Sequence, residues 1–291
     1  MKSSSVLIVG CGDLGNRTAA LLQREGWQVT GVRRSLDKLG PGIEGVSADY
    51  TQPGSLDFAR DLKPDFVLAT FNPFDRSEAG YIKGFRDAMQ NLLDGLGTHA
   101  PRYMVMSSST RVFAERDGGW VNEDSALSQE DPWAQAIIAA EQLLQQAGHP
   151  STVVRFAGIY GIPGGRLLSR VRRGELCPAE PVSFTNRIHR EDCAGFLAHL
   201  FLTVAQGGEA RPVYIGADGV PAPRYEVESW LAQQMGLSFD NTPADGGAAG
   251  PTQHNRAGHR RCRNDALLAS GYRLRYPSFR EGYGALLSSP G

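Results

Sequence analysis

The sequence predicts an α/β fold built on a doubly wound parallel sheet, and two observations predict this class. Short, fully apolar runs such as Val6–Val9 alternate with segments whose apolar residues recur at helical spacing. Strands without polar alternation are typical of parallel sheets whose two faces are both covered by helices. A glycine-rich turn, Gly10–Gly15, joins the first run directly to the first helical segment. The expected strands of this sheet are Val6–Val9, Trp27–Val32, Val46–Ala48, Phe66–Ala69, Tyr103–Met106 and Thr152–Phe156.

The helices expected between these strands are marked by their apolar spacing. Leu14, Thr18, Leu21 and Leu22 lie on one face of a helix that ends near Gly26. Two further helices are expected, over residues 79–97 and over Trp133–Ala147. The strand–helix alternation continues to Phe156 and then loosens.

After Phe156 the chain predicts a second, smaller lobe. A Gly/Pro loop covers Gly161–Gly165, and the elements expected after it are a helix near 166–173, an extended segment at 182–188, a helix at 191–204, a strand at Val213–Ile215, a helix at Tyr225–Met235 and a surface loop at 238–256. We therefore expect residues 1–160, completed by about 182–216, to form the main domain. Residues 161–181 and 217–291 are expected to form a discontinuous C-terminal substrate lobe.

Composition excludes several classes of protein. The 291 residues carry a formal net charge of −1, which argues against a nucleic-acid binder with its usual basic excess. No apolar stretch is long enough for a membrane helix, and Gly10 interrupts the N-terminal apolar run before it could act as an export signal. The four cysteines form no CxxC pair, which fits a reducing cytoplasm and predicts no metal site. The oligomeric state stays open, with a homodimer among the alternatives.

The segment Gly10-Cys11-Gly12-Asp13-Leu14-Gly15 is a GxGxxG motif between a strand and a helix. In a Rossmann domain the first glycine permits the tight turn, the second lets the backbone approach a pyrophosphate, and the third lets helix and strand pack closely. The helix N-terminus then faces the phosphates. The flanking strand and helix favour dinucleotide binding over a glycine turn without a ligand.

Two arginines, Arg33 and Arg34, follow the second strand, where an acidic residue would bind the ribose of NAD. A guanidinium binds a 2′-phosphate that a carboxylate would repel, so the sequence favours NADP over NAD. The alternative is two solvated arginines at a strand end. Asp49, after the third strand, is predicted either to accept a hydrogen bond from the adenine amine or to form a turn.

These segments together resemble the extended short-chain dehydrogenase/reductases, also called the NAD-dependent epimerase/dehydratase family. Each matching segment is moderately specific, and their shared order is the stronger evidence. Beside the glycine loop, they are Ala48–Tyr50, Val67–Thr70, Met106–Ser109 with Val112-Phe113, Arg155–Gly161, Arg187–Asp192 and Arg261–Asp265.

The resemblance implies further site residues. In that family the loops after the fourth and sixth strands touch the cofactor, which assigns this contact to Ala69, Thr70, Phe71, Phe156, Ala157 and Gly158. A serine after the fifth strand polarises the substrate oxygen, and counting back from Val112-Phe113 makes it Ser109. The alternative for Ser109 is a strand-end serine that bonds the local backbone.

The chain departs from the family at its proton-transfer pair, Tyr-x-x-x-Lys. Aligning Glu141 with the family's glutamate puts Trp133 at the tyrosine position and Ile137 at the lysine position. No tyrosine in the chain has a lysine four residues later, and no lysine follows Lys83. The resemblance is therefore to an atypical member, with an intact cofactor signature and no Tyr-Lys pair.

Three residues remain as candidates for proton transfer: Ser109, Tyr160 and His189. Tyr160 is also explained as a packed loop aromatic and His189 as a structural histidine. Several arginines of the second half, such as Arg166, could clamp an anionic substrate, for example a nucleotide-sugar. The sequence thus predicts an NADP-dependent oxidoreductase or epimerase/dehydratase-like enzyme for a small substrate; the alternative is a non-catalytic NADP(H)-binding sensor.

Overall fold

The computed structural model describes residues 3–237 and 258–288, and it divides into two compact units. The first unit comprises Met1–Val112, Leu127–Arg155 and Cys193–Tyr214; the second comprises Phe113–Ala126, Phe156–Asp192 and Ile215–Gly291. The loop predicted at 238–256 lies outside the described residues. The domain boundary predicted near residue 160 stays a prediction; the compact units place 113–126 and 156–160 in the second.

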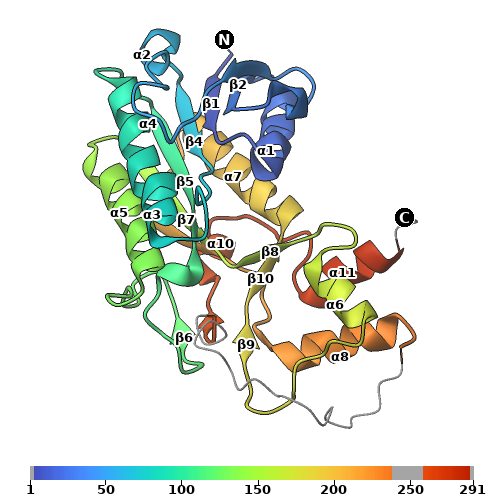
Figure 1. The fold of residues 1–291 in the computed structure, drawn as a ribbon. Coiled ribbons are helices and arrows are strands. Elements are labelled where there is room, and N and C mark those ends of the chain that lie inside the picture. The colour runs from blue at the N-terminus through green and yellow to red at the C-terminus, as the bar shows by residue number, and fades with distance from the viewer. Residues whose placement is uncertain (1–2, 238–257, 289–291) are drawn as a thin grey trace. The chain divides into compact units, whose positions relative to one another are not determined.

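A seven-stranded sheet dominates the first unit (Figure 1). Pairing is parallel from β5 through β4, β1 and β2 to β3, with Val6–Val9 in register against both Val29–Val32 and Phe66–Ala69. Because the chain builds outward from β1 on both sides, the sheet is doubly wound, as predicted. The strand order is β11 (Val213–Gly216), β7 (Ser151–Phe156), β5 (Tyr103–Ser109), β4 (Phe66–Ala69), β1 (Ser5–Val9), β2 (Gln28–Arg33) and β3 (Glu44–Ser47).

Helices cover both faces of this sheet. Figure 1 shows α4 and α5 on one side and α1 and α7 on the other. None of the helices in the described part of the chain is long and apolar enough to cross a membrane. The helices are α1 (Asp13–Arg24), α2 (Ala59–Leu62), α3 (Glu78–Tyr81), α4 (Ala88–Leu96), α5 (Pro132–Gln146) and α7 (Arg190–Ala205), with 3₁₀ turns at η1 (Leu36–Lys38) and η3 (Thr110–Val112).

The helix predicted over 79–97 is interrupted by a π-helical segment, η2 (Ile82–Asp87), between α3 and α4. Ser77 caps the start, since its side chain accepts a hydrogen bond from the Gly80 N–H at 2.9 Å. At Gly84 a Cβ atom would lie 2.4 Å from the Asn72 carbonyl oxygen. The loop after β4 therefore packs directly on the π-helical backbone, which the apolar spacing alone does not reveal.

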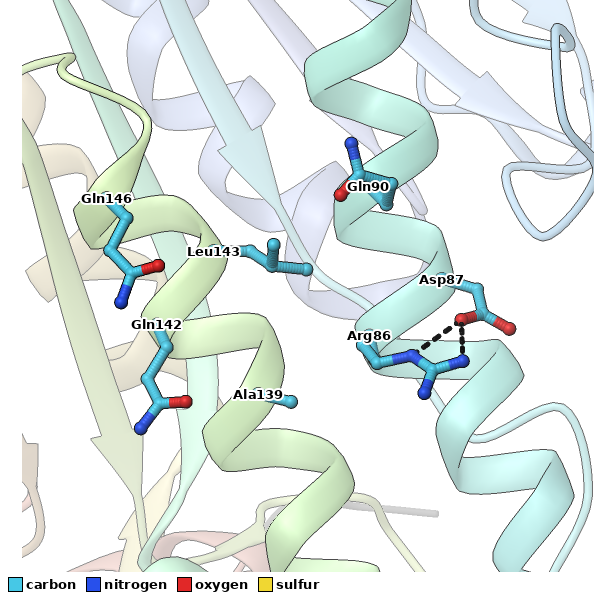
Figure 2. A pocket seen from close by; sticks show the side chains of 7 residues that line it. All are labelled: Arg86, Asp87, Gln90, Ala139, Gln142, Leu143 and Gln146. Atoms are coloured by element: carbon cyan, nitrogen blue, oxygen red, sulfur yellow. Dashed lines mark hydrogen bonds and ion pairs between the residues drawn. The ribbon is translucent and has the colours of Figure 1, made fainter.

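Helices α4 and α5 lie side by side, and a surface cavity of about 400 Å³ runs between them. Figure 2 shows Gln142 and Gln146 on α5 and Gln90 on α4 around this cavity. Arg86 pairs with the adjacent Asp87 at 2.7 Å. Five of its seven lining residues are polar or charged, and Ala139 and Leu143 are apolar.

The second unit is built from short elements around its own core. Leu168, Val171, Val227, Leu231 and Phe279 are all at most 2 % exposed and pack in one cluster. Parallel pairing joins β8 to β10 and β6 to β13, and antiparallel pairing joins β9 to β12. The elements are β6 (Trp120–Val121), β8 (Gly158–Tyr160), α6 (Arg166–Arg172), β9 (Phe184–Thr185), β10 (Arg187–His189), β12 (Ala222–Pro223), α8 (Arg224–Gln234), β13 (Arg261–Cys262), α10 (Asp265–Ala269) and α11 (Phe279–Ser288).

Candidate functional site

The glycine loop between β1 and α1 has the backbone that its sequence predicts. Gly10 has φ +82°, and a Cβ there would lie 2.5 Å from the Thr70 carbonyl oxygen. The Thr70 hydroxyl in turn donates to the Gly10 carbonyl at 2.8 Å. The turn is thus held against the end of β4, and only glycine fits at its first position.

The N-terminus of α1 offers room for a phosphate. The first N–H groups of a helix have no acceptor within the helix, and Gly12 supplies no side-chain cap. The nearest atom to a Cβ built on Gly12 is the Gly10 carbonyl oxygen at 3.7 Å, so a ligand could approach the backbone there. Gly15 packs against Ile8, while Leu14 is half-buried. Asp13 is exposed and pairs with Arg17 at 3.1 Å.

A cavity of about 280 Å³ adjoins this loop and lies entirely within the first unit. It joins the ends of β1, β2, β3 and β4, where ligands of doubly wound sheets bind. Its lining residues are Gly10, Cys11, Gly12, Arg33, Arg34, Ser35, Lys38, Ala48, Asp49, Tyr50, Thr51, Asn72, Pro73 and Phe74.

The two arginines after β2 differ in their surroundings. The Arg33 Nη1 donates to the Cys11 carbonyl at 3.1 Å and to the Lys38 carbonyl at 3.0 Å. Its Nε is buried and has no hydrogen-bond partner among the described residues. Arg34 and Lys38 are exposed at the rim of the cavity. Arg33 therefore braces the glycine loop, and Arg34 and Lys38 present positive charge to solvent.

The lining of the cavity also contains Asp49 and Tyr50. Asp49 accepts hydrogen bonds from the Thr51 N–H at 3.1 Å and the Thr51 hydroxyl at 2.7 Å, which is the turn role. Burial alone would raise the pKa of Asp49, but these bonds and the charges of Arg34 and Lys83 lower it below its ordinary value. Tyr50 packs on Phe71, with ring centroids 5.0 Å apart. Ala69, Thr70 and Phe71 are all buried at the end of β4.

The start of α5 is where the family resemblance places the Tyr-Lys pair. Asp131 caps the helix and also binds Arg111 through two contacts of 3.1 and 3.2 Å. The Arg111 guanidinium lies 5.1 Å from the Trp133 ring, and the indole Nε1 donates to the Arg76 carbonyl at 3.1 Å. Ile137 is 2 % exposed. The Trp133 indole N–H is bonded to a carbonyl, and Ile137 is a buried aliphatic residue. The start of α5 therefore offers neither the phenol nor the ammonium group of the Tyr-Lys pair.

Ser109 is the last residue of β5, because the strand runs three residues beyond its predicted end at Met106. Its hydroxyl oxygen accepts a hydrogen bond from the Arg111 N–H at 3.2 Å. This is the local backbone contact that the sequence left as an alternative, and the half-buried hydroxyl keeps its own proton to donate.

Tyr160 and His189 lie together in the second unit, on the paired strands β8 and β10. Their rings meet edge to face at 5.2 Å, and Tyr276 and Tyr283 complete an aromatic cluster at 4.0 Å from His189 and 4.5 Å from Tyr160. Burial, with Asp218 nearby, raises the pKa of Tyr160. His189 is 3 % exposed and its Nδ1 accepts a hydrogen bond from the Glu191 N–H at 3.2 Å.

The other predicted cofactor contacts, Phe156, Ala157 and Gly158, belong to the second unit. The Ala157 N–H donates to the Gly216 carbonyl at 2.9 Å, and the Gly158 N–H donates to the Asn186 carbonyl at 3.2 Å. Phe156 is buried. Among the residues that the structure describes, no three histidine, cysteine or acidic side chains gather as a metal site requires.

Two networks of the first unit are not predicted by the sequence. One is the contact of Arg111 with both Asp131 and Trp133 described above. The other is buried: Glu141 accepts hydrogen bonds from the Ser108 hydroxyl and from Arg155, whose Nη2 lies 2.8 Å from a carboxylate oxygen. The sequence signal for this network is Glu141, an acidic residue on the otherwise apolar face of α5, because a buried carboxylate needs a partner.

Comparison with known proteins places the chain in a family. Residues 10–203 match the family described as NAD(P)H-binding. Protein YeeZ of Escherichia coli strain K12 is 28% identical over 211 residues, which cover 70% of this chain and 74% of that protein.

Solved structures agree over nearly the whole chain. A proposed NAD-dependent epimerase/dehydratase from Methylobacillus flagellatus is 34% identical, with a TM-score of 0.82 and coverage of 99% of this chain and 98% of that one. UDP-glucose 4-epimerase from Thermotoga maritima shares the fold at 15% identity, with a TM-score of 0.78 and 97% coverage of both chains. The predicted resemblance is thereby confirmed: the chain belongs to the NAD(P)H-binding family and is related to the NAD-dependent epimerase/dehydratases.

Proposed function

We propose that this protein is an NADP(H)-dependent oxidoreductase or epimerase/dehydratase-like enzyme that acts on a small molecule. The observation that carries the choice of NADP is the positive rim of the glycine-loop cavity, where Arg34 and Lys38 are exposed and no acidic side chain follows β2 directly. A 2′-phosphate placed between these two cations would gain charge-assisted hydrogen bonds, whereas the ribose hydroxyl of NAD would gain none of comparable strength.

Three features of the cavity support this proposal. Gly12 leaves the backbone open to a pyrophosphate, Arg33 braces the loop, and Asp49, predicted to meet the adenine, is among the lining residues. A bound nicotinamide cofactor supplies the capacity to transfer a hydride. The residues of this chain bind and orient it.

Calorimetric titration with NADPH and NADH tests the choice of cofactor. We expect the unmodified protein to bind NADPH more tightly, and Arg34→Ala to reduce that preference by about tenfold, because one charge-assisted contact contributes roughly 1.5–3 kcal/mol. Arg33→Ala should weaken both cofactors alike, since Arg33 bonds the loop. Arg24→Ala, at the far end of α1, is the control. Equal affinity of the unmodified protein for both cofactors would refute the NADP assignment.

A second candidate, a non-catalytic NADP(H)-binding sensor, is favoured by Trp133 and Ile137 in place of a phenol and an ammonium group. The proton for an enzyme would have to come from Ser109, Tyr160, His189 or water. Incubation with NADPH or with NADP⁺ and a panel of aldehydes, ketones and nucleotide-sugars separates the two candidates. Both cofactor and substrate are followed, because an epimerase or dehydratase returns its hydride and consumes no cofactor overall. Net cofactor oxidation or reduction, or conversion of a substrate, that Ser109→Ala, Tyr160→Phe or His189→Gln abolishes supports the enzyme; cofactor binding without either change supports the sensor.

A further inference from the structure

A cavity of about 360 Å³ lies wholly within the second unit, between the loop after β8, helix α6, strand β10 and helix α11. Most of its lining is apolar. Ile159 is 49% exposed and Ile162 is 58% exposed, although both are large aliphatic residues that proteins usually bury. Exposed aliphatic side chains that share one concave surface are typical of a binding site for an apolar group.

One buried cation lines the same cavity. Arg187 is 6% exposed, its Nη2 donates to the Thr185 hydroxyl, and its guanidinium lies 5.4 Å from the Phe279 ring. Its Nη1 is buried without a hydrogen-bond partner among the described residues. A guanidinium stays charged when buried, so an unpaired one is costly unless something compensates it.

Asp218 lies close enough to act on this charge but compensates it incompletely. The Asp218 N–H donates to the Arg187 carbonyl at 2.7 Å, but no ion pair joins the two side chains within the described residues. Asp218 is 1% exposed, and its Oδ2 also has no hydrogen-bond partner there. Burial raises the pKa of Asp218 to about 7, against the opposing effect of Arg187, so near neutral pH much of this carboxyl is uncharged.

We propose that this cavity binds a small carboxylic acid, with the carboxylate on Arg187 and an apolar body against Ile159 and Ile162. One buried guanidinium is neutralised by one carboxylate, whereas a phosphate dianion would leave an excess charge among apolar walls. Arg166 also lines the cavity but is exposed, so Arg187 is the cation whose charge is buried there. As the substrate class of the enzyme, the proposal rests on the proposed function; as a binding site, it stands without it.

The test uses the full chain without cofactor and three probes of matched length: hexanoate, hexanamide and hexyl phosphate. We expect hexanoate to bind at least about tenfold more tightly than hexanamide, the fold-change of a charge-assisted contact. Hexyl phosphate should bind more weakly than hexanoate. Equal binding of acid and amide, no binding of hexanoate, or tighter binding of the phosphate ester would each overturn the proposal.

Variants locate the site and separate it from the cofactor. Arg187→Gln should abolish the preference for hexanoate over hexanamide. Because loss of a buried side chain can impair folding, Ile162→Asp serves as a second variant at an exposed position and should lower hexanoate affinity by about tenfold. Leu268→Asp is the matched control, since Leu268 is also an exposed aliphatic residue of this unit but does not line the cavity. Unchanged hexanoate affinity in Ile162→Asp would place binding elsewhere.

NADPH affinity is measured in the same variants. It should not change, because neither Arg187 nor Ile162 lines the glycine-loop cavity. Hexanoate binding with failed NADPH binding would refute the proposed function and support this site. NADPH binding with failed hexanoate binding would overturn this site and leave the proposed function standing.

Discussion

Neighbouring side chains of the same charge have different surroundings in this fold. Arg33 and Arg34 are neighbours of the same type, yet one is held by two backbone carbonyls and the other is exposed. The sequence predicts that both stand at the end of β2, because the strand pattern places them there. It cannot predict which one bonds the glycine loop, since that depends on where the chain returns at Lys38.

Asp218 gives a prediction about pH and stability. Its carboxyl has a pKa near 7 in the folded protein against 3.8 ordinarily; burial and the negative charges of Glu281 and Asp192 raise it, while Arg187 and the Val220 N–H lower it. Tyr160 and Tyr283 also lie within electrostatic range. Between these two pKa values Asp218 binds more protons in the folded state than in the unfolded state, so its contribution to stability is lost as the pH rises through that window.

In Asp218→Asn we expect the free energy of unfolding to change less between low and high pH than in the unmodified protein. A pKa shift of this size corresponds to a difference of up to a few kcal/mol. The free energy of unfolding in urea, measured at about pH 5 and about pH 8, checks it. Asp265→Asn, which changes an exposed carboxylate of the same unit, is the control. If the unmodified protein and Asp218→Asn lose stability equally as pH rises, Asp218 does not titrate in this window.

At the scale of elements, buried polar networks hold α5 against the sheet. Arg155 on β7 is 6% exposed at its side chain, its partner Glu141 on α5 is 2% exposed, and Ser108 on β5 joins them. Removing one partner of a buried ion pair leaves an uncompensated charge, which typically costs about 3–5 kcal/mol.

Glu141→Ala is therefore expected to lower the free energy of unfolding by several kcal/mol, on the order of that value. Gln142→Ala changes the next residue of the same helix, which is exposed beside the cavity in Figure 2, and should stay within about 0.5 kcal/mol of the unmodified protein. Denaturant unfolding of the two variants measures the difference. Comparable stability of the two would mean that the Arg155 charge is accommodated without Glu141.

Helix α5 also predicts the outcome of restoring the missing pair. Trp133→Tyr changes a half-buried residue near the helix start, but Ile137→Lys would place an ammonium group at a position that is 2% exposed. Burying an unpaired charge is strongly unfavourable. We expect the double variant to melt well below Trp133→Tyr alone in a thermal scan. A double variant as stable as the single one would show that a lysine at 137 reaches solvent or a partner.

At the scale of the whole molecule, the sequence predicts the features that depend on residues close together in the chain. The apolar strands, the glycine loop and the parallel sheet follow from periodicity and from turn chemistry, and they are confirmed. The short strands β6, β8, β12 and β13 were not predicted, because two or three residues carry no period and pair only with distant segments. The π-helical segment and the Arg187 cavity are not predicted for the same reason, because contacts between residues far apart in the chain create them.

The two ends of a bound cofactor should be held with different strength. The adenine end has the braced glycine loop and the cationic rim, whereas the position that the family resemblance gives to the ribose-binding lysine is a buried isoleucine. In crystals of the NADPH complex, we therefore expect the adenosine and pyrophosphate to have lower B-factors than the nicotinamide. Reduction of simple aldehydes and ketones should also be slow, since positioned proton transfer contributes roughly 10²–10⁴-fold. A nicotinamide as well ordered as the adenine, together with fast NADPH-dependent reduction of such carbonyls, would show that another residue does the work of both the lysine and the tyrosine.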